Sequence, residues 1–171
     1  EVAFRVETAG GFAADYFAAR QPADSALAKA TEANALVPHN GALYCVTSYM
    51  PPSGKLPEIN PKVLVKKSVS SGWEVDLEAG SDFMRLSFMK SVSFTTDGRG
   101  NKLSKPVSVL ISGTGTWRSQ KDTGVVVFCR NDSTGKWTRS VLSTNRWNRE
   151  KTNHSTDVRC IWDHVDRVTG V

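Results

Sequence analysis

Hydrophobic and polar positions follow two different patterns along the chain, and the change falls near residue 40. Over 12–17, Phe, Ala and Tyr recur at helical spacing, which predicts a short helix. Over 22–36, Ala and Leu recur on one face, and Pro22 suits the first turn of a second helix. Pro38 is expected to end it. We therefore predict a helical segment over 1–40.

Beyond residue 40, Val, Ser, Thr, Trp and Phe dominate, with Gly-containing breaks at short intervals. This composition is typical of an antiparallel sheet. The predicted strands are 42–49, 62–68, 73–77, 83–88, 91–96, 107–112, 124–130, 137–142 and 158–162.

The clearest local signal is a hairpin between the strands at 91–96 and 107–112. Val, Phe and Ile alternate there with Ser, as expected for strands with one wet and one dry face. The Asp-Gly-Arg-Gly run at 97–100 lies between them, and its glycines tolerate the positive φ of a tight turn. We therefore expect these two strands to pair.

Length and composition indicate one soluble domain over 1–171. Hydrophobic residues make up 39% of the chain and charged residues 23%, which excludes a disordered tail. No apolar run reaches the roughly 20 residues of a membrane-spanning helix. The predicted fold class is α+β, predominantly antiparallel β, with the N-terminal helical segment followed by a β-sandwich or wrapped-sheet body over 41–171.

The formal net charge of +5 is unevenly distributed. The first 60 residues hold four basic and six acidic residues, so the positive excess lies beyond them. Such asymmetry favours a polyanionic partner, and the alternative is a solvated basic surface.

The basic excess gathers in 117–151, which holds eight basic and three acidic residues together with Trp117, Trp137 and Trp147. Cations bind phosphates and indole rings stack on bases, so this pattern suits nucleic acid. The alternative is that the tryptophans pack in the core, since Trp is usually well buried. The candidate DNA-binding residues are Arg139, Arg146, Trp147, Arg149 and Lys151.

The sequence predicts no catalytic residue, metal site or cofactor. The histidines, His39, His154 and His164, lie beside turn residues or in the final tail, and no close cysteine pair suggests zinc. A cluster at 157–166 holds three aspartates and His164, but no second cluster completes a metal site. The Gly-Thr-Gly run at 113–115 lacks the glycine frame and helix of a dinucleotide site.

Three cysteines leave two alternatives open. A bridge between Cys129 and Cys160 would close a loop of about 30 residues and stabilise the fold by about 3–4 kcal/mol in an oxidising compartment. Cys45 would then remain free. The other alternative is three reduced, buried thiols.

Several motifs in order resemble the GspH/FimT/FimU family of type IV pilus minor pilins and type II secretion pseudopilins. They are FAADYFAARQPADSALAKA (12–30), ALYCV (42–46), SSGWEVDL (70–77), VSFTTDGRG (92–100), VVVFCRND (125–132) and VLSTNRWNR (141–149). Asn145 stands where the family has the glycine of a terminal GR motif.

This resemblance implies a non-enzymatic minor pilin or pseudopilin domain that assembles with other pilin subunits, with DNA binding by the basic hairpin as a further role. It also implies export, with inner-membrane anchoring and periplasmic exposure before display on a pilus or the cell surface. Membrane contact is expected only through an N-terminal helix missing from this sequence.

A second motif, STDVRCIWD (155–163), is similar to the C-terminal strand of Bacteroidales fimbrillin-like surface proteins. It supports the alternative of an exported fimbrial subunit or adhesin. A third alternative, a small hydrolase or nuclease, predicts that His154 or His164 faces a carboxylate in a cleft.

Overall fold

The computed structural model describes residues 32–48, 60–115, 125–143 and 157–161, and these residues form strands and turns with no helix among them. The prediction of an α+β fold is therefore wrong, because the described part of the chain is all-β. Its strands are β1 (Glu32–His39), β2 (Ala42–Ser48), β3 (Lys62–Lys66), β4 (Glu74–Glu78), β5 (Arg85–Thr96), β6 (Lys102–Gly115), β7 (Val125–Asn131) and β8 (Lys136–Ser143).

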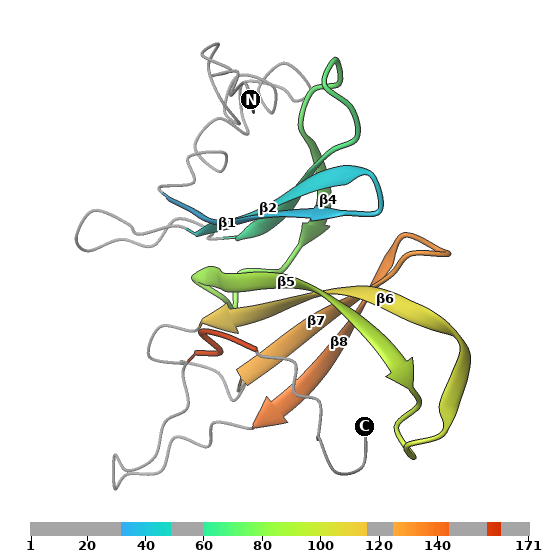
Figure 1. Cartoon of the computed structure of the whole chain (residues 1–171). Coiled ribbons are helices and arrows are strands. Elements are labelled where there is room, and N and C mark those ends of the chain that lie inside the picture. The colour runs from blue at the N-terminus through green and yellow to red at the C-terminus, as the bar shows by residue number, and fades with distance from the viewer. Residues whose placement is uncertain (1–31, 49–59, 116–124, 144–156, 162–171) are drawn as a thin grey trace, which may run out of the picture.

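The eight strands form one antiparallel sheet that curls into a nearly closed barrel (Figure 1). Strands β1 to β4 make one meander, here called the first half, and β5 to β8 make another, the second half. Among the described residues, backbone pairing between the halves is confined to one register pair, Ser48 with Arg85. Side chains must therefore supply most of the remaining contact between them.

Strand β1 occupies part of the segment predicted to be helical. The helix predicted over 22–36 is wrong for 32–36, while its earlier part and the helix predicted over 12–17 lie outside the described residues. Asn40 and Gly41 have φ values of +46° and +78°, the left-handed conformations that a two-residue hairpin turn requires. This turn sends the chain back along β2, so the backbone of β1 finds partners in the sheet.

The predicted strands from 42–49 to 137–142 are confirmed with changes in extent. Segments 83–88 and 91–96 belong largely to one strand, β5, and 107–112 widens into β6. A register shift between Leu86 and Phe88 adds one residue to β5 and changes its alternation. Leu86 and Met89 consequently both reach the core, a spacing that a regular strand does not allow.

The turn predicted at 97–100 is confirmed. Asp97 and Asn101 are joined by a backbone hydrogen bond of 2.8 Å, and Gly100 has a φ of +83°. The strand predicted at 158–162 is wrong for 158–161, which form no strand, and Trp162 lies outside the described residues. The preceding residue, Asp157, forms an isolated bridge with Gly115.

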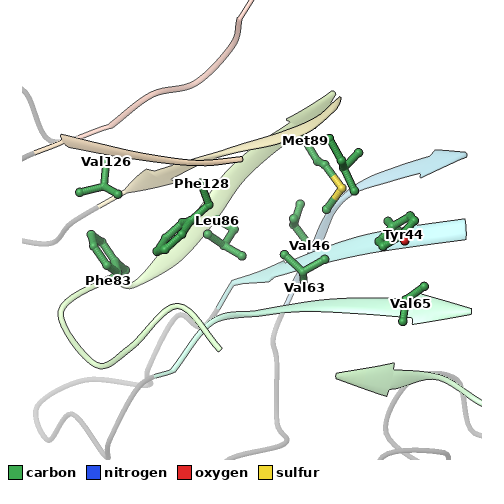
Figure 2. Close-up of a cluster of buried hydrophobic side chains, with 10 residues drawn as sticks. Tyr44, Val46, Val63, Val65, Phe83, Leu86, Met89, Val126 and Phe128 are labelled. Atoms are coloured by element: carbon green, nitrogen blue, oxygen red, sulfur yellow. The ribbon is translucent and has the colours of Figure 1, made fainter. Parts of the chain in front are cut away.

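The core lies between the two halves and draws side chains from both (Figure 2). Tyr44, Val46, Val63 and Val65 come from the first half. The second half and the loop before it contribute Phe83, Leu86, Met89, Leu110, Val126 and Phe128. Because each half has one face against the other, burying this core holds the barrel together.

Candidate functional site

A network of polar side chains lies where the two halves of the barrel meet. It draws on six strands and two turns, and we call it the polar cluster. Its members are His39, Asn40, Tyr44, Asp76, Ser91, Arg130, Asp132 and Trp137.

Asp76 joins edge strand β4 to the second half. Its carboxylate accepts hydrogen bonds from Arg130 Nε at 2.9 Å and from Trp137 Nε1 at 2.7 Å. A longer contact of 3.4 Å from Arg130 Nη2 to the other carboxylate oxygen completes a two-pronged pair. Strand β4 has no backbone pairing with β8 among the described residues, so Asp76 closes the barrel on this side with side-chain bonds.

His39 joins β1 to β5 and to the β7–β8 turn. Its Nδ1 lies 2.8 Å from Ser91 Oγ, and its Nε2 lies 2.8 Å from Asp132 Oδ2. Since a carboxylate only accepts, Nε2 carries the donated hydrogen, and in the neutral ring Nδ1 accepts from the Ser91 hydroxyl. Asn34 forms a second link between β1 and β5, because its side-chain amide donates to the Leu86 carbonyl oxygen at 2.8 Å.

Asp132 connects the two sets of contacts. It accepts hydrogen bonds from His39, from Asn40 Nδ2 at 2.8 Å and from Arg130 Nη1 at 2.8 Å. The Arg130 guanidinium also lies 5.4 Å from the centre of the Tyr44 ring, a cation–π distance. Hydrogen bonding to Asp76 raises the pKa of Arg130, and burial raises the pKa of Tyr44.

Hydrogen bonds join Ser91 to His39 and His39 to Asp132, as in a hydrolytic triad. The surroundings of these side chains, however, differ from those of a reactive centre. The His39 ring, which would have to serve as the base, is only 1% exposed. A nucleophile must meet substrate as well as its base. The geometry is therefore suited to holding β1, β5 and the β7–β8 turn together.

The sequence analysis identified His39 but assigned it no partner, and it did not single out Asp76 or Asp132. One signal was available: Asn40-Gly41 between two apolar segments is a strong hairpin motif. It would have predicted a strand before the turn and placed Ala35, Val37 and His39 on one face. No pattern of spacing brings Asp76 to Arg130 and Asp132, because Asp76 and Arg130 are 54 residues apart in the chain.

Of the predicted DNA-binding residues, only Arg139 lies in the described part of the chain. It is exposed on β8, and its guanidinium lies 5.5 Å from the centre of the Phe83 ring. Arg146, Trp147, Arg149 and Lys151 fall outside the described residues, so their role stays a prediction. Trp137 donates to Asp76 and packs against the core, which agrees with the packing alternative for that tryptophan.

Asp157 anchors the C-terminal segment 157–161 to the second half. Its carboxylate is 7% exposed and contacts Arg85, Ser87 and Arg159. The next residue, Val158, donates its backbone N–H to the Thr114 carbonyl oxygen at 3.0 Å. His154, His164 and the aspartates of the 157–166 cluster other than Asp157 lie outside the described residues.

The three cysteines are free thiols in different surroundings. Cys45 lies beneath Trp73 and Leu64 on the outer face of the first half and is fully buried. Burial raises its pKa to about 12 and also raises the pKa of the partly buried Cys129. Cys160 is exposed.

We expect the folded, reduced protein to react with iodoacetamide at pH 8 first at Cys160, more slowly at Cys129, and at Cys45 only after unfolding. Alkylation requires the thiolate and access to it, and burial limits both. Peptide mass spectrometry over a time course measures the order. Early labelling of Cys45 would contradict the burial, and a Cys129–Cys160 bridge, which stays a prediction, would leave both unlabelled without reductant.

Among the described residues, no group of three or more His, Cys, Asp or Glu side chains is arranged to hold a metal ion. The same part of the chain has no helix with the length and apolarity needed to cross a membrane. Comparison with protein-family models, curated proteins and solved structures gives no match for this chain. The fold and the site therefore define a class only: an antiparallel, barrel-like β domain closed by a partly buried polar network.

Proposed function

We propose that the chain is a non-enzymatic subunit of an exported fibre, of the fimbrial-subunit or adhesin class. The observation that carries this proposal is the polar cluster, in which the charged and polar side chains are used to join strands of the two halves. Buried, mutually bonded polar groups rigidify a domain and specify one arrangement of its strands. A rigid β domain is the form of building block that a fibre or adhesin needs.

The packing of the C-terminal segment also supports this class. The segment that carries the fimbrillin-like motif is partly described, and Asp157 and Val158 contact β5 and β6. The helical motif of the minor-pilin resemblance, residues 12–30, lies outside the described residues, so that resemblance stays a prediction.

Fractionation of the source cells tests the proposal. We expect antibodies against the chain to detect it in the surface material released by shearing, in particles larger than a monomer. An antibody against a cytosolic enzyme serves as the fractionation control. Recovery of the chain only with that cytosolic marker would contradict export and assembly.

A further inference from the structure

The turn end of the β5–β6 hairpin, residues 93–108, extends past the rest of the second half, and we call it the arm. Strand β6 pairs with β7 only from Leu110 to Gly113, so residues of β6 before Leu110 pair with β5 alone. Figure 1 shows the arm pointing away from strands β1 to β4. It is a two-stranded ribbon with most of its residues exposed.

The arm carries an exposed apolar pair. Phe94 and Val107 lie directly opposite each other in the register and are 45% and 49% exposed. The neighbouring pair on the same face is more covered, since Val92 is buried and Val109 is half-buried. Isolated exposed apolar side chains are common, but two that lie directly opposite each other form a patch that suits a binding surface.

The arm also carries three cations. Arg99, Lys102 and Lys105 are exposed, and none of them forms an ion pair with another described residue. The one acidic residue of the arm, Asp97, forms hydrogen bonds within the turn. Its carboxylate accepts hydrogen bonds from the backbone N–H groups of Arg99 and Asn101 and from Asn101 Nδ2. These bonds lower the pKa of Asp97.

The charge of the arm continues over the second half. Residues 85–115 and 125–143 hold eight basic and two acidic side chains, while 32–48 and 60–84 hold three basic and five acidic ones. The uneven charge distribution of the sequence therefore corresponds to a difference in net charge between the two halves of the barrel. An anionic partner is favoured at the second half.

We propose that the arm binds single-stranded nucleic acid, with Phe94 stacking on a base and the three cations contacting the flanking phosphates. Exposed aromatic rings beside basic residues are the usual means of binding a strand without reading its sequence. Lys102, Lys105 and Pro106 on one strand disfavour an added β-strand as the occupant. This inference does not depend on the proposed role in a fibre.

An anionic membrane is the competing occupant, and the order of residues along the arm argues against it. The tip, 97–101, is polar and charged, and Phe94 and Val107 lie behind it. Inserting the apolar pair into a bilayer would first bury Asp97 and Arg99, at a high cost in desolvation. A flexible strand, by contrast, can lie along the ribbon and reach the ring and the cations together.

Fluorescence anisotropy of the full chain with a labelled oligothymidylate, at several salt concentrations, tests the proposal. We expect the R99Q/K102Q/K105Q variant to reduce the slope of log K against log salt by about 2, because each lost phosphate contact removes about 0.7. We expect F94A to weaken binding about tenfold with little change in that slope. The matched controls are K67Q and V69A, at exposed positions of the first half, which should bind like the parent.

Circular dichroism and denaturation first confirm that the variants fold. Each contrary outcome then leads to a different conclusion. Absence of binding at low salt would overturn the proposal, as would an unchanged salt slope in the triple arm variant. Loss of binding in R146Q/R149Q with normal binding by the arm variants would place the site in the predicted basic hairpin. Binding to phosphatidylglycerol vesicles that the oligonucleotide does not displace would favour a membrane.

Discussion

Replacing Asp76 with alanine is expected to lower the free energy of unfolding by about 3 kcal/mol, the usual cost of breaking a buried ion pair. The Asp76 and Arg130 side chains are each 14% exposed, so water replaces little of the lost interaction. The change also leaves the indole N–H of Trp137 without its acceptor. Because these bonds close the barrel between β4 and the second half, their loss weakens the whole sheet.

Urea denaturation followed by circular dichroism measures the effect, and a fall of about 6–12 °C in the melting temperature should accompany it. Asp76→Asn keeps one acceptor oxygen and should fall between the alanine variant and the parent. Glu78→Gln is the matched control on the same strand, because Glu78 is 40% exposed and its ion pair with Lys62 is long, at 3.9 Å. Equal stability of D76A and E78Q would show that the contacts of Asp76 with Arg130 and Trp137 contribute little to stability.

Replacing Gly113 with alanine is expected to destabilise the fold by about 2 kcal/mol through overpacking. A methyl group at this position would lie 2.1 Å from Cε1 of Phe88 and 2.8 Å from Cβ of Val158. Phe88 is only 8% exposed, so its ring has little room to move away. The glycine thus allows β6 to pass beneath the Phe88 ring and the C-terminal segment.

A double-mutant cycle separates this clash from a general effect of the substitution. Phe88→Ala alone should cost about 3 kcal/mol because it removes a buried ring. The F88A/G113A variant should be about 1 kcal/mol more stable than the sum of the single changes predicts, since the methyl group then occupies vacated space while its close contact with Val158 remains. Gly98→Ala, where an added methyl group meets nothing within 4 Å, is the control. Strict additivity would contradict the proposed contact.

The strands of the β-rich body could be predicted because their cause is local. Over 91–96 and 107–112 the alternation of apolar and polar residues, with Asp-Gly-Arg-Gly between them, corresponds to the paired strands β5 and β6. Alternation reports which face of a strand is buried, and glycines report where the backbone must turn. The merging of 83–88 with 91–96 was missed because a bulge between Leu86 and Phe88 interrupts that alternation.

Residues 32–36 were predicted to be helical because Ala and Leu favour a helix locally, and this preference is weak enough for tertiary pairing to override it. Here the Asn40-Gly41 turn places 32–39 beside β2, and pairing overrides local preference. The same turn carries His39 into the barrel, where Ser91 and Asp132 contact its ring.

Read alone, the chain already contained its strand-forming segments, its main hairpin turn and its uneven charge, because each is a property of neighbouring residues. Only the tertiary structure decided how the barrel closes. Asp76 meets Arg130 and Trp137, which are 54 and 61 residues away, and His39 meets Asp132 across 93 residues. Such contacts depend on how strands pair and curl in space, and no local period encodes them.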